Sequence, residues 1–263
     1  MTKVTDTPVP IAWEEAGDGP PLLLVMGLGY GRWGWEPLIP LLADEFRVVT
    51  FDNRGIGESG HPEGPYTANM MAEDCRSVLN AAGVERAHVA GSSAGGMIAQ
   101  ELAIESPETV DRLILMSTTP GGDESYPMPS VTTELLAQVE QMAPEEALRR
   151  LVENALSPDA PEEAVDRIMH HRLDKPQSPE GWQAQAAAGI GYDGSGRARR
   201  IAAPTLILHG ESDNVVDTRN ADVLHHLIPN SRVELVPGGH LFFWESPRQA
   251  AELMTSFLSG DGR

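Results

Sequence analysis

Short runs of consecutive apolar residues recur along the chain and alternate with stretches in which apolar residues stand at helical spacing. The runs predict buried β-strands at residues 21–26, 47–52, 86–91, 110–117, 204–210 and 232–237. The stretches between them predict helices at residues 36–43, 67–82, 93–105 and 217–227. Alternating strands and helices are typical of a parallel sheet that is covered by helices on both faces.

The two ends of the chain extend this pattern. Residues 9–15 are predicted to add an antiparallel edge strand to the sheet. A last helix is predicted to end at Leu258, with Ser246 as its N-cap and Pro247 at its first helical position. Serine suits a cap because its side chain can accept a backbone N–H, and proline suits the first turn because no partner exists there for its missing N–H.

The alternation of strands and helices stops between Thr119 and Ala203. Proline followed by acidic residues occurs three times in this segment, at residues 144–146, 161–163 and 179–180, and each occurrence is typical of a helix start. We therefore predict an α/β core domain formed by residues 1–119 and 204–263, with a helical cap inserted as residues 120–203.

The sequence Gly91-Ser92-Ser93-Ala94-Gly95 lies where a predicted strand changes into a predicted helix. A Gly-x-Ser-x-Gly motif in that position predicts a nucleophile elbow, in which a strained turn exposes the serine hydroxyl. A glycine-rich turn that merely opens a packed helix is the alternative interpretation. The preceding strand, the following helix and the downstream candidates for a base and an acid favour Ser93 as a nucleophile.

A serine nucleophile needs a base, and the base needs a third group to hold it. His240 follows the last predicted strand directly, in the glycine-containing loop 237–240, and is our predicted base. We expect His209, at the end of another strand, only to hydrogen-bond its own loop. Asp213 lies in the turn after strand 204–210 and is the predicted acid, with Asp52 as the next candidate.

The developing oxyanion of acyl transfer needs two hydrogen-bond donors. The predicted donors are the backbone N–H groups of Ala94, directly after the nucleophile, and of Leu28, in the glycine turn after strand 21–26. The candidate substrate contacts are the apolar residues Trp33, Met142, Trp182 and Phe242. A cap of this length is expected to roof a closed pocket of about 300–1,000 Å³.

Composition narrows the possible partners and location. The chain has 263 residues and a formal net charge of −20, which disfavours nucleic acids and anionic membrane surfaces as partners. No segment has the length of a membrane helix, and the first residues show no secretory signal. The single cysteine, Cys75, excludes an internal disulfide and favours a cytoplasmic location. No cofactor and no metal are expected, because the histidines and carboxylates lack ligand spacing. The oligomeric state stays open.

Taken in order, these motifs resemble the α/β-hydrolase superfamily. The resemblance is carried by Gly27-Leu28-Gly29, by residues 52–59 (DNRGIGES), by residues 91–96 (GSSAGG), by Asp213 and by Gly239-His240. It is strongest to the compact branch of esterases and lactonases, which includes 3-oxoadipate enol-lactonases. The chain departs from the commonest family pattern at Met26, where many members have histidine, and at Ala94, where many have methionine.

The resemblance implies a cofactor-independent serine hydrolase of small to medium carboxylic esters or lactones, with Ser93, Asp213 and His240 as its triad. Carbon–carbon bond hydrolases and haloperoxidase-like enzymes are alternatives with the same fold. A protein that binds a small molecule without turning it over is a third alternative, and an intact triad disfavours it.

Overall fold

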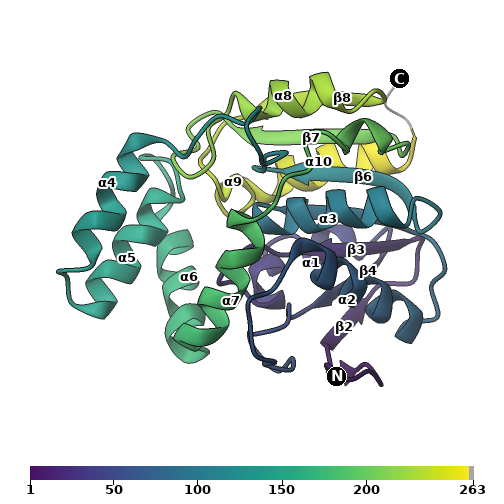
Figure 1. The fold of residues 1–263 in the computed structure, drawn as a ribbon, viewed down its shortest axis with the longest axis horizontal. Helices are drawn as coiled ribbons and strands as arrows, with labels where there is room; N and C mark the ends of the chain where they lie inside the picture. Colours follow the sequence, from purple (N-terminus) through teal and green to yellow (C-terminus); the bar gives the residue numbers. More distant parts are fainter. Residues whose placement is uncertain (261–263) are drawn as a thin grey trace.

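A single eight-stranded sheet forms the centre of the computed structural model, which describes residues 1–260 (Figure 1). The order of its strands is β1-β2-β4-β3-β5-β6-β7-β8. β2 pairs antiparallel with both β1 and β4, and all strands from β4 onward in this order are parallel to one another. The predicted α/β class with a mostly parallel sheet is confirmed. The strands are β1 (Lys3–Val4), β2 (Ala12–Ala16), β3 (Pro21–Val25), β4 (Arg47–Phe51), β5 (Ala87–Ser92), β6 (Val110–Met116), β7 (Thr205–Gly210) and β8 (Ser231–Val236).

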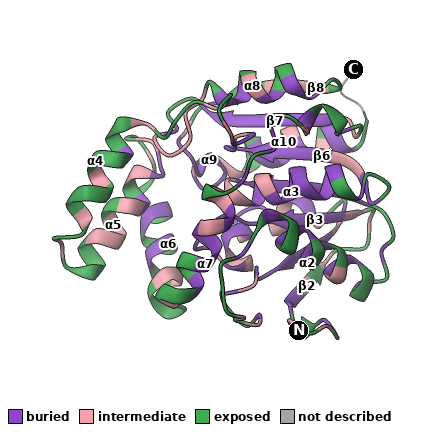
Figure 2. Cartoon of the chain, viewed as in Figure 1, coloured by how far each residue is buried: buried purple, intermediate pink, exposed green. Residues whose placement is uncertain are grey.

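Neighbouring residues of each central strand pack into two different cores, one on each face of the sheet. In β3, Leu23 and Val25 belong to the core beneath helices α2 (Ala68–Ala81), α3 (Ala94–Glu105) and α8 (Asn220–Leu227). Leu22 and Leu24 belong to the opposite core, beneath α1 (Ile39–Leu42), α9 (Phe242–Glu245) and α10 (Pro247–Leu258). Burial on both faces explains why these strands are continuous apolar runs (Figure 2).

Two helical segments differ from their prediction. The helix expected at residues 36–43 is shortened to α1 (Ile39–Leu42), and the separate 3₁₀-helix η1 (Arg32–Trp35) precedes it; Pro37, between the two, has no N–H to continue a helical ladder. The last helix has Pro247 in its first turn as predicted. Its Ser246 makes no side-chain cap, because α9 ends at the same serine, which adopts φ −135° and ψ 65°.

Four α-helices and one 3₁₀-helix lie between β6 and β7, where the helical segment was predicted. They are α4 (Ser130–Val139), α5 (Pro144–Asn154), α6 (Glu162–Asp174), α7 (Pro179–Ile190) and η2 (Ala198–Arg200). The three predicted helix starts are confirmed, since acidic residues occupy the first turns of α5, α6 and α7. Figure 1 shows α4 to α7 gathered at one side of the sheet.

Candidate active site

Ser93 lies between β5 and α3, on the turn that the motif predicts. Its backbone has φ 57° and ψ −125°, a region that side-chain-bearing residues rarely adopt. Its N–H donates to Met116 O at 2.9 Å, and Thr118 Oγ1 donates to Ser93 O at 2.7 Å. Strand β6 and the residues after it therefore hold the strained turn from one side, while the Ser93 side chain is partly exposed.

The two glycines of the motif are required by close packing. A Cβ on Gly91 would lie 2.3 Å from Gly95 O, and a Cβ on Gly95 would lie 2.1 Å from Val25 O. Real side chains do not approach backbone oxygens this closely. The absence of side chains at these positions thus lets β5, α3 and the end of β3 come together around the turn.

The loop after β3 brings a second backbone segment beside Ser93. A Cβ on Gly27 would lie 2.9 Å from Ser93 Cβ and 3.4 Å from Ser93 Oγ, so this loop and the hydroxyl are neighbours. Within residues 1–260, the N–H groups of Leu28 and Ala94 have no hydrogen-bond partner. Two unpaired N–H groups next to a partly exposed hydroxyl can stabilise negative charge that develops on a carbonyl oxygen.

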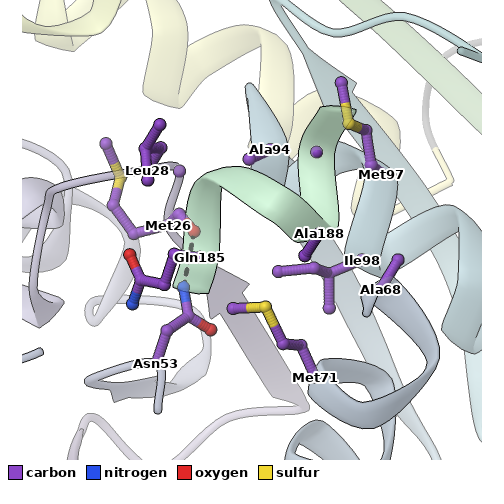
Figure 3. A pocket seen from close by; sticks show the side chains of 12 residues that line it. Met26, Leu28, Asn53, Ala68, Met71, Ala94, Met97, Ile98, Gln185 and Ala188 are labelled. Carbon is purple, nitrogen blue, oxygen red and sulfur yellow. Dashed lines mark hydrogen bonds between the residues drawn. The ribbon is translucent and has the colours of Figure 1, made fainter. Parts of the chain in front are cut away.

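Side chains from two other segments hold this loop in place. Asn53 Nδ2 donates to Met26 O at 2.8 Å (Figure 3), and Arg172 Nη1 of α6 donates to Gly29 O at 2.9 Å. Gln185 of α7 accepts the Gly29 N–H at 3.5 Å. The loop that carries Leu28 is therefore fixed from the sheet side by Asn53 and from the inserted helices by Arg172 and Gln185.

Asp213 and His240 meet in the buried loops after β7 and β8. Asp213 Oδ2 lies 2.8 Å from His240 Nδ1, and the two residues are 6% and 5% exposed. Asp213 Oδ1 accepts the N–H groups of Val215 at 2.8 Å and Val216 at 2.9 Å. Among the described residues, no hydrogen bond joins His240 to Ser93 Oγ; in hydrolases without substrate such bonds are often long.

A second histidine also contacts the Asp213 carboxylate. His209 Nε2 is 3.1 Å from Val216 O, the loop contact expected from the sequence, and also 3.1 Å from Asp213 Oδ2. Burial acts to raise the pKa of the Asp213 carboxyl. The charge of His240 and the hydrogen bonds from both histidines outweigh it and hold this pKa well below its usual range.

The loop that carries His240 is tied to the inserted helices through Glu245. Glu245 Oε1 accepts the N–H of Gly239 at 2.8 Å and the N–H of Ser157 at 3.0 Å, and Ser157 Oγ donates to Oε2 at 2.5 Å. One carboxylate therefore bridges the histidine loop and the segment after α5.

Asp52, the next candidate for the acid, is engaged elsewhere. Its Oδ1 accepts the Arg32 N–H at 2.7 Å, its Oδ2 accepts the Glu58 N–H at 3.0 Å, and the Arg32 guanidinium pairs with it. The Asp52 carboxylate thus fixes the loop around Glu58, and Asp213 is the carboxylate that meets His240.

A narrow, mostly apolar cavity opens beside Leu28 and Ala94 (Figure 3). Its volume for the centre of a water molecule is about 10 Å³, room for roughly one water and far less than the pocket expected from the sequence. Side chains of α2, α3 and α7 fill the space. The other lining residues are Met26, Gly27, Asn53, Ala68, Met71, Met97, Ile98, Gln185, Ala188 and Gly189.

None of the four predicted substrate contacts lines this cavity. Trp33 stacks on His171 of α6 with ring centroids 4.7 Å apart, and Phe242 is 1% exposed in the core beneath α10. Trp182 is 42% exposed on α7, and Met142 is partly exposed between α4 and α5. Their part in substrate binding stays a prediction. The place of Met97 and Ile98 in the cavity lining could have been predicted, because both follow the elbow directly on α3. Nothing in the sequence around Met71 and Gln185 indicates that these residues line a cavity.

Comparisons with known proteins show the family of this chain. The family model of the alpha/beta hydrolase fold matches residues 20–160 and 136–247, so the chain belongs to the alpha/beta-hydrolase family. It is 30% identical over 255 residues to a protein of Azorhizobium caulinodans provisionally named carbamate hydrolase RutD, with 93% of each chain covered. It is 29% identical to the pimeloyl-[acyl-carrier protein] methyl ester esterase of Aeromonas hydrophila, with 94% and 99% covered.

A solved structure is similar over nearly the whole chain. It is a thermophilic esterase from Thermogutta terrifontis, 26% identical, with a TM-score of 0.83 and 98% of each chain covered. Among residues 1–260, no helix is long and apolar enough to cross a bilayer. Within that same range, no group of three or more histidine, cysteine, aspartate and glutamate side chains could hold a metal ion.

Proposed function

We propose that this protein is a cofactor-independent serine hydrolase that cleaves a small to medium carboxylic ester or lactone through an acyl-enzyme. Ser93 is the nucleophile, His240 the base and Asp213 the acid, and the N–H groups of Leu28 and Ala94 form the oxyanion hole. The observation that carries the proposal is the strained, partly exposed Ser93 beside two unpaired N–H groups. The Asp213–His240 hydrogen bond supports it.

The proposed reaction has two halves. In the first, Ser93 Oγ attacks the carbonyl carbon and passes its proton to His240 Nε2, while the carbonyl oxygen, now negative, accepts the two N–H groups. The tetrahedral intermediate collapses, the bond to the alcohol breaks, and His240 returns the proton to that alcohol. In the second half, water gives its proton to His240, attacks the acyl carbon and releases the acid, and Ser93 Oγ regains a proton.

We also propose that residues 120–203 act as a cap over a core of residues 1–119 and 204–263. Support comes from contacts between the inserted helices and the loops of the site: Gln185 and Arg172 hold Gly29, and Ser157 shares Glu245 with the histidine loop. In this arrangement the cap shapes the substrate space and keeps water from the reacting carbonyl.

The narrow cavity favours a short acyl group. If the carbonyl oxygen accepts the Leu28 and Ala94 N–H groups, the neighbouring space holds about one water-sized group before Met71, Ile98 and Ala188 are met. An acetyl-sized acyl part fits that space, and a carbamoyl group has the same size. The alcohol part faces fewer constraints, since Ser93 and Ala94 are partly exposed.

The proposal is tested by pre-steady-state kinetics with chromogenic esters. A nitrophenyl acetate should release nitrophenol in a burst equal to the enzyme concentration, because acyl-enzyme accumulates before it is hydrolysed. kcat/KM should fall steadily from acetate through butyrate to octanoate, with lactones and carbamates of small acyl size included in the panel. A protein that binds these compounds without releasing product would show that the site is not catalytic.

A further inference from the structure

His209 is buried at the end of β7 with a contact that the proposed reaction does not use. It is 0% exposed, and its Nε2 has two near neighbours, Asp213 Oδ2 and Val216 O, each 3.1 Å away. Both neighbours are acceptors, so Nε2 carries a proton and donates it. The Nδ1 atom has no partner among the described residues. The neutral Nε2–H tautomer leaves only a lone pair unpaired there, whereas a charged ring would bury an unpaired N–H.

His209 is connected to the Asp213 carboxylate through Val216. Oδ1 accepts two backbone N–H groups, from Val215 and Val216, and the carbonyl oxygen of Val216 accepts the His209 Nε2–H at 3.1 Å. Oδ2 accepts from His240 Nδ1 at 2.8 Å, and the His209 ring lies against this oxygen, with Nε2 3.1 Å away. The His209 donor therefore holds the turn that orients the carboxylate.

We propose that His209 is a positioning residue for the hydrolase: its Nε2–H holds Val216 O, and with it the turn whose N–H groups donate to Asp213 Oδ1, so that Oδ2 stays in line with His240 Nδ1. The inference rests on the proposed function, because it assigns a purpose to the Asp213–His240 pair. Without the His209 donor, the turn at Val215 and Val216 would be free to shift together with the carboxylate that it holds through Oδ1. The imidazole, whose Nε2 is 3.1 Å from Oδ2, also limits this movement by direct contact.

A matched pair of variants separates the donor from mere packing. His209→Gln keeps an N–H donor at a similar reach, and His209→Leu keeps a comparable volume without a donor. By analogy with groups that orient metal-binding histidines, the leucine variant should lose about 10- to 100-fold in kcat with KM unchanged. The glutamine variant should keep most of the wild-type kcat. Thermal unfolding of both variants checks that they are folded.

A second measurement determines which nitrogen of His209 carries the proton. NMR of the wild-type protein with labelled histidine should show one buried ring with its proton on Nε2, and this signal should vanish in both His209→Gln and His209→Leu. A proton on Nδ1 of His209 would overturn the inference, and so would a folded leucine variant with wild-type kcat or a glutamine variant as slow as the leucine one. If the leucine variant does not fold, the inference is tested by the position of the His209 proton in the NMR spectrum and by the kcat of the glutamine variant.

The same assay with Ser93→Ala and Asp213→Asn distinguishes the two ways of failing. If these variants retain activity, the proposed function is wrong. If they are inactive while His209→Leu keeps its kcat, the hydrolase stands and only the positioning role of His209 is lost.

Discussion

The loops at the edge of the sheet and the helices inserted after β6 are held by very different packing. Strands β5 and β7, which lead to Ser93 and Asp213, are buried at every residue. Helices α4 and α5 each bury one residue, Thr132 and Val152, and Figure 2 shows their outer faces exposed. The strands that lead to the sheet edge are fixed by close contact on both faces. In the inserted segment, α6 and α7 each bury one side against the cores, for example through Ile168 and Ala184, whereas α4 and α5 are mostly exposed.

This difference matches the two tasks of the proposed enzyme. Attack and proton transfer need groups held to a fraction of an ångström, which suits the ends of buried strands. Shaping the substrate space needs only a surface of the right outline, which exposed helices can provide. Changes at the sheet edge should therefore abolish activity or folding, and changes in the inserted helices should tune activity.

The largest losses are expected for the base and the acid. His240→Ala should lower kcat by about 10⁶-fold. Asp213→Asn should lower it by up to about 10⁴-fold, because the imidazole loses its tautomer and orientation. Steady-state kinetics on a chromogenic acetate measure both, with Glu211→Gln, an exposed neighbouring carboxylate, as the matched control. Near-wild-type kcat in Asp213→Asn would contradict the assignment of Asp213 as the acid.

Substitutions in the two regions should also differ in how much they lower the free energy of unfolding. Gly95→Ala places a Cβ 2.1 Å from Val25 O and should lower the free energy of unfolding by about 3 kcal/mol or more. Gly196→Ala, in the inserted segment, meets nothing within 4 Å and should change it by less than about 0.5 kcal/mol. Urea denaturation of both variants measures the difference. Equal free energies of unfolding for the two variants would contradict the tighter packing of the sheet edge at Gly95.

A contact between the inserted helices and the sheet edge should give an intermediate effect. Gln185→Leu removes the acceptor of the Gly29 N–H and the donor to Arg54 O. Loss of about 1 kcal/mol in the positioning of the oxyanion loop corresponds to roughly a fivefold lower kcat. Gln183→Leu, on the exposed side of α7, is the control. A change in KM alone would assign Gln185 to substrate binding instead.

The smallest effect concerns acid stability. The folded pKa of Asp213 is held below its usual value, so its ionised form stabilises the fold above the unfolded pKa of about 4 and that stabilisation is lost as pH falls. The Tm difference between wild type and Asp213→Asn should be largest from about pH 5 upward and shrink below about pH 4. A difference that grows in acid would show that the carboxyl is neutral in the folded protein.

The turn at Ser93 and the loop positions of Asp213 and His240 were predictable because their signals are local. Ser93 is marked by an apolar run, two glycines and a helical pattern, all within one short stretch. Asp213 and His240 each follow a strand, and the carboxyl ends of neighbouring parallel strands meet at one edge of the sheet. Their hydrogen bond was therefore foreseeable from strand order, without any knowledge of side-chain positions.

The lining of the cavity was not predictable, because it depends on which distant helices meet. Met71 and Gln185 come from α2 and α7, and nothing in their own sequence surroundings marks them. Trp33 and Phe242 are marked in the sequence only by their apolar rings. In the structure Trp33 stacks on His171 and Phe242 lies in a core, and their part in substrate binding stays a prediction. The double contact of His209 was likewise hidden, since sequence shows its place at a strand end but not which way its ring turns.

Covalent labelling tests the central claim most directly, because it asks whether Ser93 is an activated nucleophile. Intact-mass analysis after treatment with an organophosphate or a sulfonyl fluoride should show a single adduct on the wild-type protein. Peptide mapping should place that adduct on Ser93, and the folded Ser93→Ala variant should carry none. An adduct of the same mass on Ser93→Ala would contradict the assignment of Ser93 as the nucleophile.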